Sequence, residues 1–251
     1  MSHELEITQG IDGGEKLCIN QVESTGQQSY DPYLYYASSV EVSHLFYFFK
    51  RVIDICLSLF SLLLFLPLAL IIILFIKIDS RGPVFIRQQR IGKTRRLHTD
   101  VLSGKDERRK RDLFGEPISI YKFRTMYSDV DLYAVTPNNN SDKRITRCGK
   151  ILRRLGLDEL PQLLNVLRGE MSIVGPRPEM PFLVSQYNAL ERCRLLEKPG
   201  ITGYWQIHAP RDMHIHESLQ YDLFYIKNKS MLFDVKIMLK TVMYILSMKN
   251  N

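Results

Sequence analysis

Two adjacent carboxylates, Asp158-Glu159, lie in a segment that is otherwise rich in arginine. A carboxylate can act as a nucleophile toward phosphorus, and a neighbouring carboxylate can hold a divalent cation that bridges phosphate oxygens. Arginine offers a planar, permanently charged fork that binds phosphate oxygens in pairs. These residue types together favour phosphoryl-transfer chemistry. The arginines of this segment are Arg144, Arg147, Arg153, Arg154, Arg168 and Arg177.

The leucines that follow the acidic pair recur at helical spacing and predict an amphipathic helix over residues 159–168, ending at Gly169. Pro161 is tolerated because it would lie in the first turn. Asp158 is then expected near the N-cap, where free N–H groups also favour an anion. The simpler alternative is that Asp158 only caps this helix and that Glu159 only interacts with its dipole.

A stiff turn, Gly175-Pro176-Arg177-Pro178, follows and is expected to hold Arg177 in a fixed direction. With this turn, the chain from about Lys50 to about Val242 closely resembles the bacterial sugar transferases, the monotopic phosphoglycosyl transferases. Such an ordered series of motifs is far more specific than an acidic pair alone. The motifs are Arg144-Ile-Thr-Arg-Cys-Gly, Leu157-Asp-Glu-Leu-Pro-Gln, Asn165-Val-Leu-Arg-Gly-Glu-Met-Ser-Ile-Val-Gly-Pro-Arg-Pro and Lys122-Phe-Arg-Thr-Met.

The resemblance implies a transfer of sugar-1-phosphate from a UDP-sugar to a polyprenyl phosphate, such as undecaprenyl phosphate. In that reaction Asp158 would attack the phosphorus that carries the sugar and expel UMP. The polyprenyl phosphate would then attack the sugar-phosphoryl-Asp intermediate. Asp158 and Glu159 would also hold Mg²⁺. The candidate substrate- and phosphate-binding residues are Lys122, Arg124, Arg144, Arg153, Arg177 and Asp222.

Two other function classes are compatible with the same residues. A glycosyltransferase would move the sugar without its phosphate and release UDP instead of UMP. A non-catalytic membrane scaffold would recruit partners through its basic surface and release no nucleotide. The acidic pair and the arginines around it favour the transferase with a covalent intermediate.

The charge of the chain is distributed unevenly. The 251 residues carry a net charge of +7, but residues 1–51 contain three basic and seven acidic residues, and residues 52–251 contain 31 basic and 20 acidic ones. A basic body suits anionic lipids, phosphorylated substrates or nucleic acid. No helix-turn-helix, zinc-finger or RNP pattern supports nucleic acid, and four scattered cysteines without Cys-x-x-Cys indicate neither a zinc site nor a disulfide framework.

Residues 52–76 are the only long apolar segment, and as a helix they would be long enough to span a bilayer. Pro67 interrupts this segment, and basic residues flank both of its ends, so the positive-inside rule gives no orientation. A helix that breaks at Pro67 and re-enters the same face accounts for both features; a single-pass helix is the alternative. The expected anchor residues are Lys50, Arg51, Asp54 and Pro67, with Asp54 paired to Arg51 or bound to headgroups.

The resulting fold class is α+β, mainly helical, with a re-entrant helix-break-helix and amphipathic surface helices. Residues 1–45 are expected to be a flexible polar tail, residues 46–80 the re-entrant membrane helix, and residues 81–251 a catalytic domain on the cytoplasmic face of the bacterial inner membrane. A final amphipathic helix to about Met248 is expected to contact either the bilayer or the core. A homo-oligomer is possible.

Three further stretches carry weaker patterns. Residues 103–112 are highly charged and are interpreted as a solvated loop. His214 and His216, with Asp212, form a weak metal-ligand pattern on a polar loop. Trp205, in the family block Gly203-Tyr-Trp-Gln, is expected to stack on a base, to lie at the membrane interface or to pack in the core.

Overall fold

The computed structural model describes residues 44–94, 115–130, 142–208 and 219–247. The predicted tail, apart from its last two residues, lies outside the described residues. So do the charged insertion 103–112 and the His214–His216 pair. All described residues belong to one compact unit, Tyr33–Asn251, and they are mainly helical with two small sheets, as the sequence predicted.

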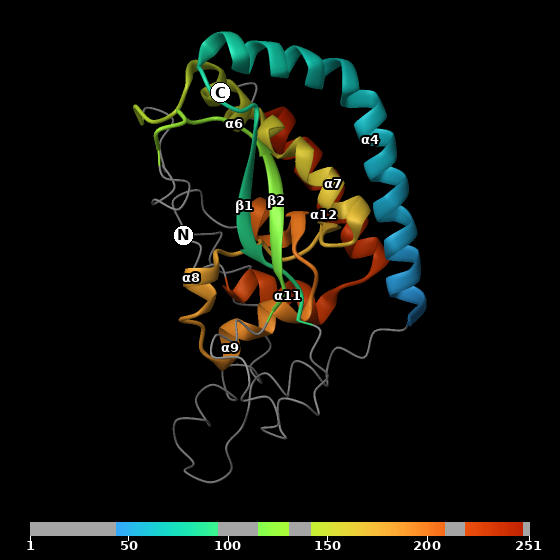
Figure 1. The fold of residues 1–251 in the computed structure, drawn as a ribbon. Coiled ribbons are helices and arrows are strands. Elements are labelled where there is room, and N and C mark those ends of the chain that lie inside the picture. Colours follow the sequence, from blue (N-terminus) through green and yellow to red (C-terminus); the bar gives the residue numbers. More distant parts are fainter. Residues whose placement is uncertain (1–43, 95–114, 131–141, 209–218, 248–251) are drawn as a thin grey trace, which may run out of the picture. The chain divides into compact units, whose positions relative to one another are not determined.

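Helix α4, His44–Asp79, contains the whole apolar segment and is the one described helix that is long and apolar enough to cross a membrane. The predicted break at Pro67 is wrong, because α4 is one continuous helix of 36 residues that contains Pro67. Figure 1 shows instead that α4 bends between its blue and teal parts. Proline removes one backbone hydrogen bond and displaces one turn, which allows a bend without ending the helix.

The first half of α4 is tied to the rest of the protein by a buried ion pair. Lys50 pairs with Asp234 of α12, Met231–Ser247, and its Nζ also donates to Val174 O at 3.0 Å. Tyr225 of α11, Leu219–Asn228, donates its hydroxyl to the same Asp234 carboxylate at 2.9 Å. Lys50 and Asp234 are both at least nine-tenths buried, so Lys50 binds the protein body and not lipid headgroups.

Arg51 and Asp54 also point into the protein. Arg51 Nη2 donates to Leu167 O at 2.7 Å and so satisfies a free carbonyl at the end of α7, Leu163–Arg168. Asp54 accepts hydrogen bonds from Ile173 N at 2.9 Å and Ser172 Oγ at 3.1 Å in β3, Ser172–Val174. The predicted headgroup contacts and the predicted Arg51–Asp54 pair are therefore both wrong, because these polar groups satisfy backbone groups of the body.

The second half of α4 packs on a separate apolar cluster. Ile72 and Ile76 are buried against Val84, Phe123 and Leu152. Both halves of the helix thus contact the same body, and the outward face of α4 stays apolar and exposed. The exposed residues include Phe48, Phe60, Leu63, Leu64, Leu66, Leu70, Leu74, Phe75 and Ile78.

Two small sheets support the elements that surround the acidic pair. Strand β1, Phe85–Ile91, pairs antiparallel with β2, Pro117–Phe123, and Phe85 lies opposite Phe123. Strand β3 pairs in parallel with β4, Gly200–Thr202. Between β2 and β3 the chain forms α6, Arg147–Leu155, the 3₁₀ helix η1, Leu157–Gln162, and α7. Figure 1 shows α6 and α7 on the side of the β1–β2 ribbon that faces α4.

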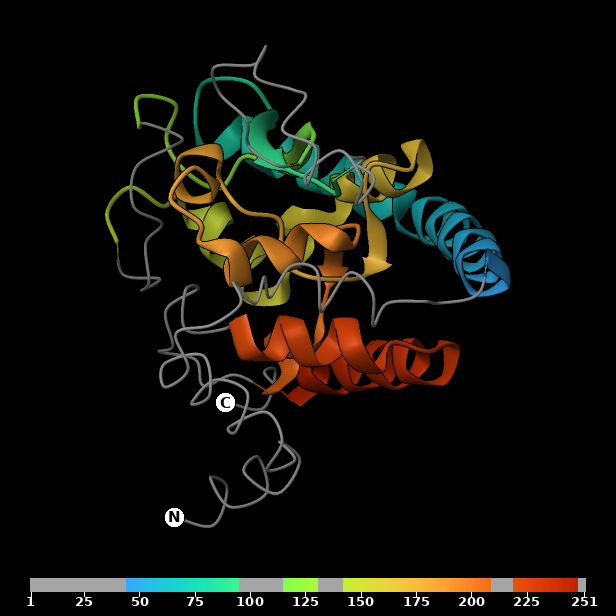
Figure 2. The same cartoon turned by 90° about the horizontal axis from the view of Figure 1, so that it is seen from below.

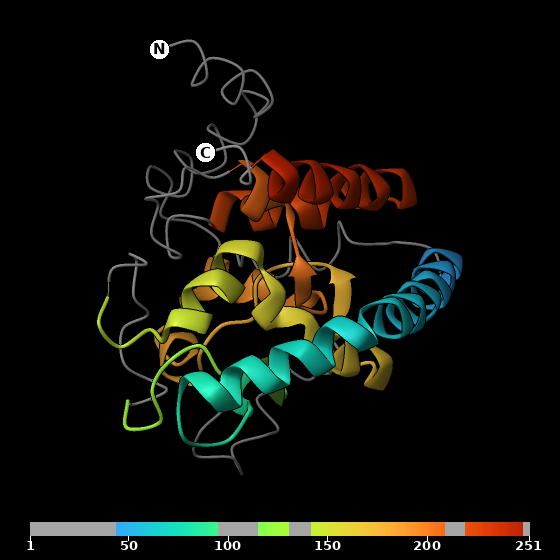
Figure 3. The same cartoon turned by 90° about the horizontal axis from the view of Figure 1, so that it is seen from above.

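The C-terminal part begins with the short helices α8, Pro181–Val184, α9, Ala189–Arg192, and the 3₁₀ helix η2, Cys193–Leu196. Helix α10, Tyr204–His208, follows β4. Figures 2 and 3 show α11 and α12 next to each other and away from the second half of α4. Ser230 caps α12 by accepting from Phe233 N, and the helix both buries Ile237 and exposes apolar residues such as Leu232, Leu239 and Met243.

Asn165 joins α7 to the open edge of β2. Its side chain is fully buried, accepts a hydrogen bond from Tyr121 N at 3.1 Å and donates to Ser119 O at 2.7 Å, in the way that another strand would. Because these partly buried backbone groups would otherwise lose their partners, the amide fixes α7, and with it η1, against the ribbon.

We expect Asn165→Leu to lower the free energy of unfolding by about 1–3 kcal/mol, because two partly buried backbone groups lose their partners. Thermal unfolding in detergent micelles would measure this change. Leu164→Gln, at the adjacent exposed position, is the matched control and should have little effect. An unfolding midpoint for Asn165→Leu equal to that of the control would show that the strand edge does not need this side chain.

Candidate active site

The acidic pair lies in η1, directly after α6. Gly156 adopts a left-handed conformation with φ of 66° between the two helices, and η1 has no side-chain cap. The prediction that Asp158 lies at the N-cap of a single helix over 159–168 is therefore wrong; a 3₁₀ helix precedes α7. The predicted end at Gly169 is confirmed, with φ of 81°.

Hydrophobic side chains on either side of the acidic pair hold it against the body. Leu157 and Leu160 pack on the cluster formed by α4, β2 and α6. The Glu159 side chain, between these two leucines in the sequence, reaches Lys122 of β2. The catalytic candidates are thus attached to the second half of the membrane-type helix through two leucines.

Glu159 forms an ion pair with Lys122 of β2, with Oε1 2.6 Å from Nζ. Burial alone would raise the pKa of Glu159, but the charges of Lys122 and Arg177 and hydrogen bonds from Lys122 and Gln162 outweigh it and lower this pKa. The pKa of Asp158 is raised by burial and by the neighbouring Glu159 charge, against the opposing charges of Lys122 and Arg153. The two pKa values are therefore shifted in opposite directions, that of Asp158 upward and that of Glu159 downward.

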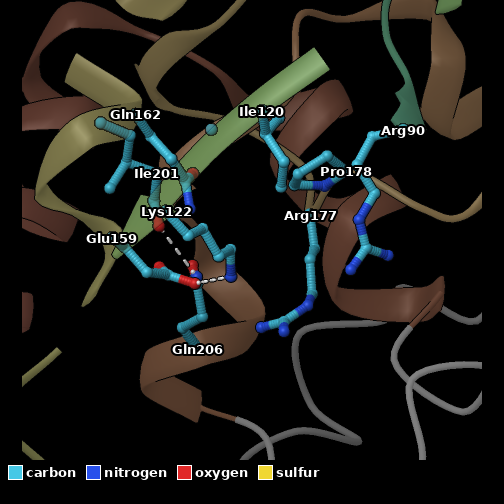
Figure 4. A pocket seen from close by; sticks show the side chains of 10 residues that line it. Arg90, Ile120, Lys122, Glu159, Gln162, Arg177, Pro178, Ile201 and Gln206 are labelled. Atoms are coloured by element: carbon cyan, nitrogen blue, oxygen red, sulfur yellow. Dashed lines mark hydrogen bonds and ion pairs between the residues drawn. The ribbon is translucent and has the colours of Figure 1, made fainter. Parts of the chain in front are cut away.

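A shallow pocket opens beside Glu159 (Figure 4). Lys122 and Arg177 come to this pocket from β2 and from the Gly175–Pro178 turn, and Arg177 also lies over the Trp205 ring, 5.3 Å from its centroid. In the part of the chain that the structure describes, Arg177 forms no hydrogen bond or ion pair in addition, so its donors are available to an anion. The pocket is lined by Arg90, Ile120, Lys122, Glu159, Gln162, Arg177, Pro178, Gly200, Ile201 and Gln206.

Arg153 is the second predicted phosphate-binding residue close to Asp158. Its Nε donates to Thr125 Oγ1 at 2.9 Å, and its charge acts on Asp158. The structure thus brings Asp158, Glu159, Lys122, Arg153 and Arg177 together, although they come from four separate segments of the chain.

Arg124 and Arg144 have other partners. Arg124 is buried, and its guanidinium donates to Ser80 O at 2.6 Å and Arg81 O at 2.9 Å, where it satisfies carbonyls at the end of α4. Its assignment to phosphate is wrong for this reason. Arg144 forms a bidentate ion pair with Asp142, with Nη2 2.7 Å from Oδ2. A phosphate would have to compete with Asp142 for it.

Asp222 lies in a buried charge network behind the Gly175–Pro178 turn. Its carboxylate is 2.7 Å from Arg194 Nη2, and the same guanidinium atom lies 3.4 Å from Glu179 Oε1. All three side chains are almost completely buried. Its assignment as a substrate-binding residue is therefore wrong; Asp222 instead supports the turn that carries Arg177.

Two polar residues of this pocket, Gln162 and Gln206, were not predicted from the sequence, and Arg90 of β1 lies with them. Arg90 had a recognisable signal, because Gln88 and Arg90 alternate with exposed residues along β1 and share its buried face. Gln206 lies in the predicted family block that also contains Trp205. No sequence pattern indicated Gln162. Its hydrogen bond to Glu159 depends on the 3₁₀ geometry of η1, which the sequence did not predict.

The acidic pair fits a magnesium ion only in part. Among the described residues, no three His, Cys, Asp or Glu side chains come together as a complete protein-made metal site. Magnesium is commonly held by one or two carboxylates plus water and substrate phosphates, and Asp158 and Glu159 provide that number of ligands. The donor set therefore fits an ion that is bound together with a phosphorylated substrate.

The described residues thus combine an acidic pair, cationic side chains beside it and an exposed apolar helix that is long enough to cross a membrane. The chain belongs to the bacterial sugar transferase family, whose model matches residues 45–248. This result confirms the family resemblance that the motifs predicted.

The curated relatives agree with this family. The chain is 35% identical to the UDP-N-acetylgalactosamine-undecaprenyl-phosphate N-acetylgalactosaminephosphotransferase of Aeromonas hydrophila, over 82% of this chain and 45% of the relative. It is 39% identical to the UDP-glucose:undecaprenyl-phosphate glucose-1-phosphate transferase of Escherichia coli K12, over 77% and 39%. It thus spans less than half of these two proteins. It is 34% identical to the exopolysaccharide production protein ExoY of Sinorhizobium fredii, over 77% and 83%.

We expect Arg194→Met to destabilise the protein by about 3–5 kcal/mol, because two buried carboxylates lose their counter-charge. Burial raises the pKa of Asp222 to about 6 even with Arg194 opposing it, so the loss of Arg194 should raise this pKa further. A raised pKa favours the folded state at low pH and costs stability as pH rises, so the destabilisation should be larger at pH 7.5 than at pH 5.

Thermal unfolding of Arg194→Met and the unsubstituted protein at both pH values would measure this difference. Arg147→Met, an exposed arginine on α6, is the control for a lost positive charge. An equal loss of stability at pH 5 and pH 7.5 would contradict the pKa argument while leaving the ion pair in place.

Proposed function

We propose that this protein transfers a sugar-1-phosphate from a UDP-sugar to undecaprenyl phosphate and releases UMP, as the initiating step of a polysaccharide or glycoconjugate pathway. The observation that carries the proposal is the acidic pair Asp158-Glu159 beside Lys122 and Arg177, all attached to a membrane-type helix. The names of the relatives support the acceptor and the class of donor.

In the first half-reaction, an oxygen of Asp158 forms a bond to the phosphorus that carries the sugar, and the bond from this phosphorus to the oxygen of UMP breaks. In the second, a phosphate oxygen of undecaprenyl phosphate attacks the same phosphorus, and the Asp158–phosphorus bond breaks. The product is undecaprenyl-diphosphate-sugar, and the carboxylate is regenerated. Each step exchanges one phosphorus–oxygen bond for another, so no external reductant or oxidant is required.

The charges around Asp158 fit the needs of a nucleophile. A more basic carboxylate is a stronger nucleophile once it is ionised, and Lys122 and Arg153 favour its ionised form against burial. Arg177 and Lys122 would stabilise the negative charge on the phosphoryl oxygens. Asp158 and Glu159 would hold Mg²⁺, which would neutralise part of the diphosphate charge when bound.

We expect Asp158→Asn to reduce UMP release by roughly 1,000-fold or more, because the amide cannot form the phosphoryl bond. Purified protein in detergent would be given Mg²⁺, undecaprenyl phosphate and a panel of UDP-sugars, and the released nucleotide would be identified. Asp129→Asn, an exposed acid on the loop after β2, is the matched control.

The three outcomes of this assay separate the function classes. UMP from one donor, lost in Asp158→Asn, would support the covalent mechanism and name the sugar. UDP release would place the protein among glycosyltransferases that transfer the sugar alone. Absence of release with every donor, while the protein stays folded, would favour the membrane scaffold.

We also propose that α4 enters and leaves the cytoplasmic face of the inner membrane. Supporting this topology, Lys50 near one end of α4 and Asp79 at the other both bind the same protein body: Asp79 accepts a hydrogen bond from Cys148 N at 2.8 Å. A straight helix of 36 residues would be about 54 Å long and would place its ends on opposite faces of a bilayer. The bend allows the exposed apolar face to enter the bilayer while both ends stay on one side.

Single cysteines at positions 45 and 81, both exposed, would test the topology. We expect both to react with a membrane-impermeant maleimide from the cytoplasmic side of inverted vesicles and neither to react in intact cells. Pro67→Ala should favour a spanning helix and move one position to the other side. Labelling of the two positions from opposite faces in the unsubstituted protein would exclude the re-entrant arrangement.

A further inference from the structure

Trp205 is the only tryptophan of the chain, and the catalytic proposal gives it no role. It lies half-buried on α10, and the sequence left open whether it stacks on a base, lies at the membrane interface or packs in the core. In the structure the guanidinium of Arg177 lies over its ring, with Cζ 5.3 Å from the ring centroid. A cation within about 6 Å of a tryptophan centroid is attracted to the face of the ring.

The backbone that carries Arg177 is fixed by strand β4. Gly175 N donates to Thr202 O at 3.0 Å. Pro176 O accepts from Gly200 N, in the same strand, at 2.8 Å. Because these bonds hold the turn, the direction of the Arg177 guanidinium depends on its side chain alone.

The Arg177 side chain needs a partner that restricts it. It forms no hydrogen bond or ion pair within the part of the chain that the structure describes, and Figure 4 shows it reaching the pocket alongside Lys122 and Gln206. A long side chain loses rotamer freedom when it binds a phosphate, and this loss of entropy opposes binding. A ring that restricts the side chain beforehand reduces the loss.

The Trp205 ring is itself held in place by the helix that carries it. The preceding residue, Tyr204, stacks on Phe224 of α11, with ring centroids 4.9 Å apart, and lies 5.4 Å from the ring of Phe233 of α12. Successive residues of a helix point about 100° apart, so one turn of α10 can contact these two helices and Arg177 at once. The two C-terminal helices thus fix the ring that Arg177 contacts.

Two observations indicate that Trp205 acts on Arg177 and not on a ligand. The described residues that line the pocket include Arg177 and Gln206 but not Trp205. The indole Nε1 is buried, and the described residues offer it no hydrogen-bond partner. Buried indole N–H groups usually have such a partner, so the orientation of this ring follows from the contacts of its face.

We infer that Trp205 is a positioning residue, which holds the guanidinium of Arg177 at the pocket where the substrate phosphates bind. The inference rests on the function proposed above and adds how the site keeps this cation in place. Because Trp205 acts through Arg177, loss of the ring should weaken the binding of phosphate ligands by the same factor, whatever group the phosphates carry.

The test is a double-mutant cycle on the full chain in detergent micelles with Mg²⁺ present. Isothermal titration calorimetry gives the affinity for two probes, inorganic pyrophosphate and UDP. We expect Trp205→Leu to weaken the binding of both probes by about 5- to 10-fold, the effect of one partly buried cation–π contact. In the Arg177→Met background the same substitution should cause no further loss, because the ring has no cation left to hold.

Two variants make this result specific. Trp205→Tyr keeps an aromatic face and should recover most of the affinity. Phe182→Leu, which removes an exposed ring from α8, should bind both probes like the unsubstituted protein. A loss confined to UDP would mean that Trp205 stacks on the base, and equal losses in both backgrounds would mean that the ring acts on the fold of the pocket. Either result would overturn the inference.

The emission of the single tryptophan reports the same contact by a second method. We expect saturating pyrophosphate to change the emission of the unsubstituted protein, since the bound anion offsets the positive charge beside the ring. Arg177→Met should abolish this change. A change that persists in Arg177→Met would show that the ligand affects the ring without Arg177 and would contradict the positioning role, as would an unchanged emission at saturation.

The binding data also separate this inference from the proposed function. Absence of binding of both probes to the unsubstituted protein would overturn both proposals. Binding that Arg177→Met weakens and Trp205→Leu leaves unchanged would overturn only the positioning role of Trp205.

Discussion

Four consecutive residues at the end of β2 hold the membrane helix and the candidate site together. Lys122 pairs with Glu159, and Phe123 packs with Ile72 and Ile76 of α4. Arg124 satisfies the carbonyls at the end of α4. Alternation along an extended chain sends neighbouring side chains to opposite sides, so one short segment can contact several elements at once.

The next residue, Thr125, completes this junction. Its carbonyl accepts from Thr146 N at 3.0 Å, at the N-cap of α6, and its hydroxyl accepts from Arg153. Gly149 is required for this contact, because a Cβ there would lie only 2.0 Å from Thr125 O. Helix α6 is thereby held close against β2, and η1 follows with the acidic pair at a fixed distance from Lys122.

The polar residues of α4 show how much of the contact between α4 and the rest of the protein could be predicted from the sequence. Lys50, Asp54 and Ser58 recur at every fourth position and are all buried, so they form one polar face that was present in the sequence as a spacing. The predicted position and apolar character of this helix are confirmed, although the break at Pro67 is not. Asp54 was expected to pair with Arg51 or with headgroups, however, because the sequence does not show that the backbone of β3 and the Asp234 side chain of α12 need partners from this face.

The residues of the candidate site likewise include some whose contacts could be predicted from the sequence and some whose contacts could not. Family motifs predicted the convergence of Asp158, Glu159, Lys122 and Arg177, since each motif carries its own residue. For Arg144 the competing partner was visible, because Asp142 is only two positions away. The partner of Asp222 was not visible in the sequence, because Arg194 comes from a different segment and contacts Asp222 only in the folded protein. Sequence shows the charge of a side chain, but its burial and its partner decide whether it binds substrate.

The Asp158-Glu159 pair reconciles two opposing physical requirements. A carboxylate that attacks a phosphorylated substrate must stay partly desolvated to be reactive, but burial next to another carboxylate favours its neutral form. The structure treats the two carboxylates differently: Lys122 and Arg177 lower the pKa of Glu159, while burial and the Glu159 charge raise the pKa of Asp158. Because Lys122 belongs to the same β2 segment that holds α4 and α6, the segment that fixes the long apolar helix also acts on the charge of the candidate nucleophile.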